Sequence, residues 1–218
     1  MTERSQGQLK SMKSQWKLVL LLGIFVTALL VANTIASKLI VVGGLVMTAG
    51  IIAFPITFAV TDIIGEVWGK QMAMYFVRVG FVTNLLMVAL YTAAIKLPAA
   101  SFWGAQESLV TILGGVPRIV GASMVAYIMS QTWDVYIFHR IRDLTQGRML
   151  WLRNNVGTFT AQALDSAVFL VLAFGGTMPT SALWSMYVSY IIVKWIIALI
   201  DTPFVYMGVA WARKEEVE

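Results

Sequence analysis

Cysteine is absent from the 218-residue sequence, and histidine occurs once, as His139. Without cysteine the chain can form no disulfide bond, no thiolate nucleophile and no cysteine-ligated metal site. A single histidine cannot build a metal cluster, and His139 stands at the edge of a basic segment, where a surface role is expected. The sequence also contains no P-loop, no glycine-rich dinucleotide motif and no catalytic triad. We therefore expect neither a metal nor a cofactor, and no fused ATPase.

Charged residues are scarce as well. They make up 12% of the chain, and a typical soluble domain has roughly twice that fraction. Hydrophobic residues make up 59%, and several apolar runs are longer than the roughly 18 residues that a membrane-spanning helix needs. This composition predicts an all-α, polytopic membrane protein whose spans occupy nearly the whole chain. A membrane-anchored enzyme with a separate catalytic head is therefore disfavoured.

The apolar runs predict six transmembrane helices in one domain, residues 17–211, flanked by an N-terminal arm (1–16) and a tail (212–218). The glycine-bearing segment 41–50 is either a short hairpin or the broken entry to the second span. Residues 96–117 form an amphipathic connection expected at the membrane interface. The six spans are expected at about 17–37, 51–69, 72–95, 118–138, 155–174 and 182–211.

Lysine and arginine concentrate on one side of this predicted topology. The arm, Lys70, the segment 140–153 and the tail hold most of them, whereas the other side has Lys38, Lys96 and Arg118. Basic loops stay in the cytoplasm, so both termini are expected there. The net charge of +5 is then a signal of topology, and no nucleic-acid partner is expected.

Two groups of three spans raise the question of an internal repeat. Thr57 and Phe58 precede Asp62 in much the same way as Thr158-Phe159 precedes Asp165. Three spans per half would require an inverted repeat, as in many transporters. The spacing to the aspartate differs by two residues between the halves, so the sequence leaves the 3+3 inverted repeat open.

Ionisable residues inside the predicted spans are the main candidates for function. There are seven of them: Asp62, Glu66, Arg78, Asp134, Asp165, Lys194 and Asp201. Five carboxylates thus face two cations, so at least three carboxylates need protonation, a water-filled cavity or a cationic or donor-rich ligand.

Structural salt bridges are the alternative explanation for these residues. Lys194 would then pair with Asp165 or Asp201, and Glu66 with a cation of the third span, Arg78. Glu66 lies four positions after Asp62, so the two carboxylates share one helix face. Asp62, Asp165 and Lys194 lie deepest in their spans and are the stronger candidates for binding.

Amides and aromatic rings accompany the carboxylates. Gln131 lies three residues before Asp134, and Gln162 three residues before Asp165. Amide groups both donate and accept hydrogen bonds, so they suit the edge of a neutral polar ligand. Five aromatic residues would either stack on a flat ring or serve as packing and interfacial residues: Phe54, Phe58, Tyr127, Trp133 and Trp195.

With these residues in view, the chain resembles the queuosine precursor transporter family, also called the VUT family of vitamin uptake transporters. The resemblance covers all six spans and rests on Asn33, Lys38 and four segments: 54–69 (FPITFAVTDIIGEVWG), 131–142 (QTWDVYIFHRIR), 160–169 (TAQALDSAVF) and 189–203 (SYIIVKWIIALIDTP). It implies import of the 7-deazaguanine precursors of queuosine, the 7-cyano form (preQ0) and the 7-aminomethyl form (preQ1). The expected location is the bacterial inner membrane.

The resemblance also implies roles for individual residues in alternating access. The ring edge would be bound by Asp62, Asp134, Asp165, Gln131 and Gln162. Lys194 would balance their charge. Glu66 and Asn33 complete the predicted set, and Glu66 matches only one branch of the family.

Two other functions are alternatives. Size and span number also fit a substrate-binding subunit of an energy-coupling-factor vitamin transporter, which would need a separate ATPase. A small intramembrane enzyme would need a nucleophile–base pair or a metal cluster, and the sequence offers neither. The expected partners are a small-molecule substrate and membrane lipid. The sequence leaves open homodimer formation, the preferred precursor and the driving force.

Overall fold

The computed structural model describes residues 3–146 and 150–213. Residues 1–2 of the predicted arm, Arg148 of the basic segment and residues 214–218 of the tail lie outside this part. The described elements are α1 (Glu3–Ile35), β1 (Leu39–Val42), β2 (Leu45–Thr48), η1 (Ala49–Ile52), α2 (Phe54–Val67), α3 (Lys70–Lys96), α4 (Gln106–Leu113), α5 (Val116–Leu144), α6 (Leu150–Phe174) and α7 (Thr180–Arg213). Because α1 begins at Glu3, the predicted arm and the first span lie in one continuous helix.

Long apolar helices dominate the structure, as the composition predicts. Five segments are long and apolar enough to cross a membrane: Gln15–Ile35, Lys70–Lys96, Gln106–Ile141, Val156–Phe174 and Thr180–Ile197. The prediction of an all-α, polytopic membrane protein is therefore confirmed. The amphipathic connection contains α4, a helix of 8 residues without a buried side chain.

The predicted second span is shorter as an α-helix than expected. α2 has 14 residues, about 21 Å at 1.5 Å per residue, whereas the hydrocarbon core of a bilayer is about 30 Å thick. Residues Ala49–Ile52 form a 3-10 helix instead, and Pro55 stands in the first turn of α2. Gly69, with φ 86°, ends the segment before α3. The count of six spans and the inverted repeat stay predictions.

A β-hairpin occupies the segment that the sequence left undecided. β1 and β2 pair antiparallel, with Val42 opposite Leu45. Gly43 and Gly44 form the two-residue turn with φ values of 57° and 81°. A two-residue turn of this kind needs positive φ at both positions, which glycine adopts without strain. The hairpin alternative is thus the correct one for this segment.

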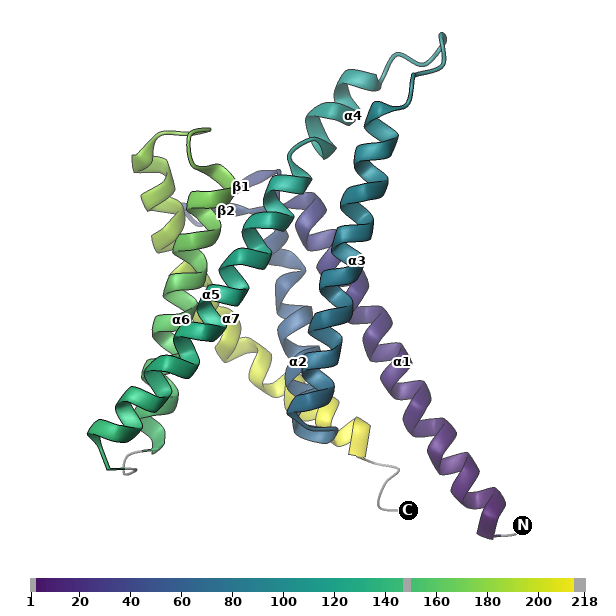
Figure 1. Ribbon diagram of the computed structural model, residues 1–218, viewed down its shortest axis with the longest axis vertical. Coiled ribbons are helices and arrows are strands. Elements are labelled where there is room, and N and C mark those ends of the chain that lie inside the picture. Colours follow the sequence, from purple (N-terminus) through teal and green to yellow (C-terminus); the bar gives the residue numbers. More distant parts are fainter. Residues whose placement is uncertain (1–2, 147–149, 214–218) are drawn as a thin grey trace.

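The helices form two groups (Figure 1). We call α1, α2 and α3 the α1–α3 group, and α5, α6 and residues 180–197 of α7 the α5–α6 group. The second half of α7 crosses to the α1–α3 group and packs on α2, where Gly208 lies against Ile63. Pro203 lies inside α7 and removes one backbone hydrogen bond from the helix. α7 is therefore the helix that joins the two groups.

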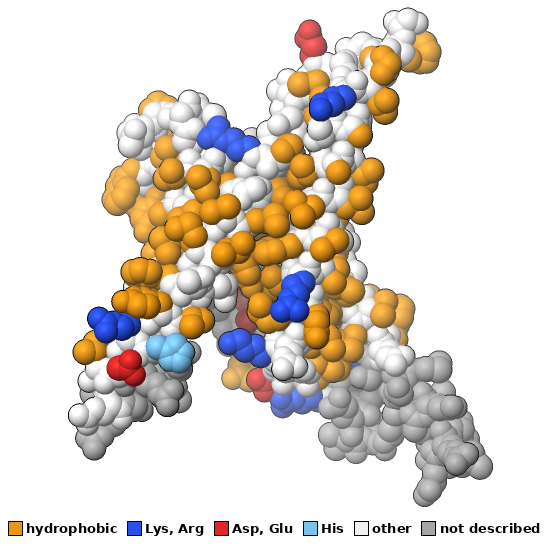
Figure 2. Space-filling view, in the orientation of Figure 1, with side chains coloured by type: hydrophobic (Ala, Val, Ile, Leu, Met, Phe, Trp, Pro, Cys, Tyr) orange, Lys and Arg blue, Asp and Glu red, His pale blue; other side chains and the backbone are white. Residues whose placement is uncertain are grey.

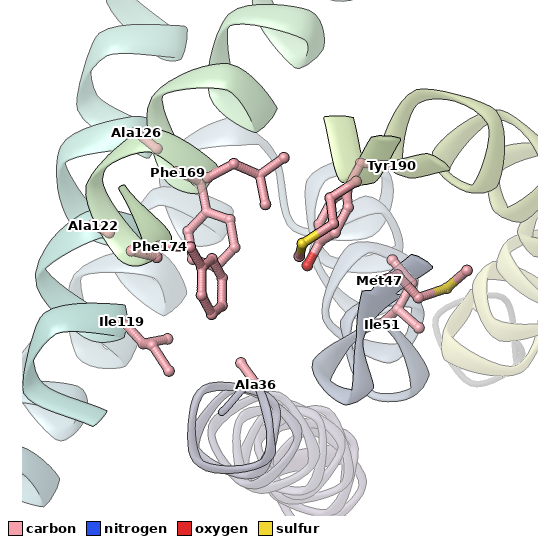
Figure 3. Packing of buried hydrophobic residues seen from close by; sticks show 12 residues of the cluster. Ala36, Met47, Ile51, Ile119, Ala122, Ala126, Phe169, Phe174 and Tyr190 are labelled. Atoms are coloured by element: carbon pink, nitrogen blue, oxygen red, sulfur yellow. The ribbon is translucent and has the colours of Figure 1, made fainter. Parts of the chain in front are cut away.

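One hydrophobic cluster joins both groups beside the hairpin (Figure 3). It contains Ala36 in the turn after α1, Met47 of β2, Ala122 of α5, Phe169 of α6 and Tyr190 of α7. The Tyr190 and Met186 side chains are almost completely buried, 3% and 0% exposed. We call the end of the molecule beside the hairpin the hairpin end. The apolar side chains of the cluster fill the space between the two groups there, and we call them the seal.

The opposite end holds the start of α1, the α2–α3 turn, the end of α5, the start of α6 and the end of α7 (Figure 1). We call it the basic end, since Lys70 and Arg140 lie there. Figure 2 shows hydrophobic side chains across the middle of the surface, with most charges toward the two ends. It also shows the molecule hollowed between the two groups at the basic end. The apolar cluster thus joins the two groups near the hairpin, whereas a hollow separates them at the basic end.

Candidate functional site

The centre of the candidate site is an ion pair between α6 and α7. Lys194 Nζ donates to Asp165 Oδ2 at 2.9 Å and to Ser166 Oγ at 2.8 Å. The Lys194 and Asp165 side chains are 14% and 33% exposed. Of the two predicted partners for Lys194, the structure selects Asp165. Pairing keeps both charges tolerable within apolar helices, where an isolated charge is expensive.

The ion pair lies next to the sealed hairpin end. Phe169 and Tyr190, both in the hydrophobic cluster, are four residues from Asp165 and Lys194 along α6 and α7 respectively. Four residues of helix are about 6 Å, and α6 and α7 run in opposite directions, so both offsets point toward the basic end. Tyr190 Oη contacts the Thr48 hydroxyl at 2.6 Å, which ties α7 to the hairpin. The ion pair therefore stands one helical turn below the seal.

Gln162 extends this polar face toward the basic end. It lies three residues before Asp165 on α6 and is half-buried, so both side chains share one helix face. Its side chain forms no hydrogen bond with the residues that the structure describes. The amide thus has no partner among the described residues, and its predicted contact with a ligand stays a prediction.

Asp134 and Gln131 of α5 lie farther away. A Cβ atom on Gly157 of α6 would come within 2.7 Å of Asp134 Oδ1, so Asp134 packs directly against this glycine. Gly157 is eight residues before Asp165, about 12 Å along the helix. Gln131 is exposed on α5. The structure therefore places these two residues nearer the basic end than the ion pair.

Asp62 lies near Asp201 of α7 and not in the ion pair. The charges of these two carboxylates, on α2 and α7, repel each other, and neither side chain has a cation among the described residues. Asp62 belongs to the α1–α3 group, whereas Asp165 and Lys194 belong to the other group. The three residues that the sequence ranked first thus lie in two separate places.

The predicted pairing of Glu66 with Arg78 is wrong. Glu66 Oε1 accepts a hydrogen bond from Arg213 Nη2 at 2.7 Å, and the Arg78 guanidinium lies 5.6 Å from the centre of the Tyr75 ring. The end of α7 packs on α2 and brings Arg213 beside Glu66, 147 positions away in sequence. Both side chains are more than half exposed, so this salt bridge contributes little to stability.

Asn33 lies at the interface between α1 and α3. Its side chain is buried and donates to Asn84 Oδ1 at 2.9 Å and to the Leu29 carbonyl at 3.1 Å. Asn84 in turn donates to the Gly80 carbonyl at 2.8 Å. Asn33 Oδ1 has no hydrogen-bond partner in the described part of the chain. The predicted contact of Asn33 with substrate stays untested, and its observed contacts link two helices.

Three of the predicted stacking residues contact other aromatic rings, and Trp133 does so in a tilted pair with Tyr136, with ring centres 6.0 Å apart. Tyr127 lies edge-to-face with Phe81, with ring centres 5.3 Å apart. Trp195, one residue after Lys194, lies edge-to-face with Phe159 at 4.8 Å. Such pairs stabilise packing by about 0.5–1.5 kcal/mol beyond burial. Trp195 is still half exposed, so one side of its indole is free.

Trp133 and the remaining predicted aromatic residues have different surroundings. Trp133 Nε1 donates to Thr160 Oγ1 at 3.1 Å and links α5 to α6. Phe58 is 49% exposed, and Phe54 is half-buried at the start of α2. His139 is exposed on α5, where the sequence predicted a surface role. Within the described part of the chain, none of these four side chains forms a hydrogen bond with Asp165 or Lys194.

Two surface grooves lie away from the ion pair. One, about 220 Å³, runs between α1 and α3 and is lined by Leu30, Thr34, Met87 and Tyr91, among others. The other lies where α3 turns into α4, beside Trp103. Among the described residues, no group of three acidic or histidine side chains is placed to hold a metal ion. Neither groove is lined by a charged side chain from the described residues.

Sequence reasoning missed Ser166, which contacts Lys194 directly. Its side chain is almost fully buried, 1% exposed, and its position directly after Asp165 in a polar-poor helix is the only sequence signal that could have suggested it. Tyr190 and Thr48 were also missed, because their contact spans 142 residues.

Comparison with known proteins gives one family. A family model described as "Putative vitamin uptake transporter" matches residues 48–208, which include α2 to α7 up to Gly208. The protein named "Probable queuosine precursor transporter" of Bacillus subtilis is 33% identical over 189 residues, 85% of this chain and 82% of that protein. "Queuosine precursor transporter" of Escherichia coli is 27% identical over 72% of this chain and 65% of its own. "Probable queuosine precursor transporter" of Haemophilus influenzae is 29% identical over 58% of this chain and 52% of its own. No solved structure matches the chain.

Proposed function

The chain belongs to the vitamin uptake transporter family, which is a family of transporters and not of enzymes, and we propose that it imports queuosine precursors. The substrates would be 7-cyano- and 7-aminomethyl-7-deazaguanine, taken up across the inner membrane of a bacterium. The names of the Bacillus subtilis and Escherichia coli relatives support this substrate class.

The observation that carries the proposal is the Asp165–Lys194 pair with Gln162 beside it. A guanine-like ring presents N–H donors next to a carbonyl acceptor along one edge. Asp165 accepts hydrogen bonds from the ring N–H groups, while Lys194 and Gln162 donate hydrogen bonds to the ring carbonyl. The pair as a whole is neutral, so a neutral ring can bind without leaving an unpaired charge inside the membrane.

The other carboxylates suit the cationic aminomethyl form. Asp62, Asp134 and Asp201 lie toward the basic end and have no cation among the described residues. A substrate ammonium group, or protons, would compensate their charge. Surplus carboxylates below a neutral ring site therefore fit a family of substrates that differ in charge at one substituent.

Alternating access explains the two unlike ends. The apolar cluster around Phe169 and Tyr190 closes the hairpin end, and the molecule is hollowed at the basic end (Figure 2). If the basic end faces the cytoplasm, as the positive-inside rule predicts, this is an inward-open conformation. α7 joins both groups, so bending near Pro203 is the expected route to the outward-open state.

The test is restoration of queuosine in tRNA. A bacterium unable to make or import the precursors receives this gene and a low external concentration of one precursor. Restored queuosine supports the substrate class, and no restoration despite confirmed membrane insertion contradicts it. Uptake by purified protein in lipid vesicles, without any other component, then excludes the need for a separate ATPase subunit.

A further inference from the structure

The hydroxyl of Ser166 is held in one orientation. It is almost fully buried, donates to the backbone carbonyl of Gln162 at 3.0 Å and accepts from Lys194 Nζ at 2.8 Å. A serine hydroxyl has one proton to donate. Because the Gln162 carbonyl takes that proton, the Ser166 oxygen turns its lone pairs to Lys194.

This contact determines what the ion pair offers to a ligand. The Lys194 ammonium has three N–H donors, of which one goes to Ser166 Oγ and one to Asp165 Oδ2. Asp165 Oδ1 forms no hydrogen bond within the described residues. Both side chains remain partly exposed. The pair therefore offers one free N–H donor next to one free carboxylate oxygen.

We propose that Ser166 is a positioning residue. It holds Lys194 so that the Asp165–Lys194 pair recognises a ring lactam, which is an N–H group adjacent to a C=O group. The ring N–H donates to Asp165 Oδ1, and the ring carbonyl accepts from the third N–H of Lys194. Without Ser166, the ammonium is free to turn toward both oxygens of Asp165. This inference rests on the proposed function and adds the edge of the ring that is recognised.

The lactam distinguishes closely related rings. 7-Cyano-7-deazaguanine and 7-cyano-7-deazahypoxanthine both carry it, and they differ in the exocyclic amine. 7-Cyano-7-deazaadenine has an acceptor nitrogen and an amine where the lactam N–H and carbonyl would be. The donor and acceptor of this ring are thus in the opposite order to those of the lactam. If the ring bound, Asp165 Oδ1 and the third N–H of Lys194 would be left without hydrogen-bond partners.

The experiment measures uptake of labelled 7-cyano-7-deazaguanine by wild type and by Ser166→Ala in vesicles, with the other two rings as competitors. For S166A we expect KM to rise roughly tenfold, the effect of one charge-assisted hydrogen bond, with the maximal rate within about twofold. The preference for the hypoxanthine ring over the adenine ring should shrink by a similar factor. A purely structural role would change the amount of folded protein and leave KM and this preference unchanged.

Ser130→Ala is the matched control. Ser130 of α5 is also buried, and its hydroxyl donates to the Tyr127 carbonyl at 3.0 Å without contacting Lys194. S130A should keep the wild-type KM and ring preference.

Three outcomes overturn the inference. The first is an unchanged KM and ring preference in S166A. The second, measurable on wild type alone if S166A does not fold, is equal competition by the adenine and hypoxanthine rings. The third is wild-type protein that inserts but does not take up 7-cyano-7-deazaguanine, which overturns the proposed function itself.

Discussion

Replacing Asp165 by asparagine is the sharpest perturbation of the candidate site. The amide has nearly the shape of the carboxylate but cannot form the 2.9 Å ion pair with Lys194. Removing one partner of a buried pair costs about 3–5 kcal/mol. Since a third of the Asp165 side chain is exposed, we expect a smaller loss of unfolding free energy, about 1–3 kcal/mol.

The effect on uptake should be larger than the effect on folding. The D165N variant would lose a charge-assisted hydrogen bond to the ring, which contributes about 1.5–3 kcal/mol, or roughly 10- to 150-fold in binding. It would also leave the Lys194 charge unpaired next to the substrate. We expect no detectable queuosine in tRNA at low precursor concentration, while the variant still inserts into the membrane. Wild-type uptake by D165N would refute the assignment.

A second variant separates binding from structure. In Asp165→Asn/Lys194→Gln both charges are removed, so no charge is left unpaired. We expect the thermal stability to recover most of the loss seen in D165N, while uptake stays abolished. Recovery of uptake in the double variant would show that the pair is merely structural. Asp143→Asn, which changes an exposed carboxylate near the end of α5, is the control and should behave as wild type.

Three further predictions concern packing and gating. Gly50→Ala should lower the unfolding free energy by about 1–3 kcal/mol in thermal unfolding, because the new Cβ would meet the backbone carbonyl oxygen of Ala32 at 2.7 Å. A disulfide in Val46→Cys/Ser189→Cys should abolish uptake reversibly, because it would lock the hairpin to α7 where the Val46 N–H now donates to Ser189 Oγ at 3.1 Å. Uptake should return on reduction. Glu66→Gln should change the unfolding free energy by less than about 1 kcal/mol and leave uptake intact, since its salt bridge is exposed.

Each of these predictions has its control. Gly121→Ala on α5 adds a Cβ with no atom within 4 Å, so it should not destabilise the protein, and equal effects of G121A and G50A would contradict the packing argument. The chain has no native cysteine, so the single variants V46C and S189C isolate the cross-link. Full uptake with the disulfide formed would mean that the hairpin does not move during transport. Loss of uptake in E66Q would show that this carboxylate contributes to binding.

The membrane fold could be predicted from the sequence because it depends on composition. Apolar runs of bilayer length form helices wherever lipid leaves no other partner for the backbone, and five such helices are present. The two consecutive glycines at 43 and 44 made a hairpin one of two alternatives. The short length of α2 was not predictable, because Ala49–Ile52 are as apolar as the helix that follows and give no signal of a 3-10 turn.

The candidate site was predictable only in part. Lys194 is one of two cations that the sequence places inside spans, so a carboxylate partner for it could be expected from the cost of an unpaired charge in lipid. Which carboxylate it contacts could not, because Asp165 and Asp201 both met the criteria. The same limit explains the wrong pairing of Glu66 with Arg78, since Arg213 reaches it from the far end of the chain.

By itself, the sequence determined the all-α membrane class, the concentration of basic residues that forms one end of the molecule, and the surplus of carboxylates over cations within the spans. These follow from how much of each residue type a span contains and from the cost of charge in lipid. Only the tertiary structure decided that Asp165 pairs with Lys194, that Ser166 accepts a hydrogen bond from the ammonium, and that the pair lies one turn below the apolar cluster. Those facts depend on the relative rotation and depth of α6, α7 and the hairpin, which arise from packing between residues far apart in sequence, 142 positions in the case of Thr48 and Tyr190.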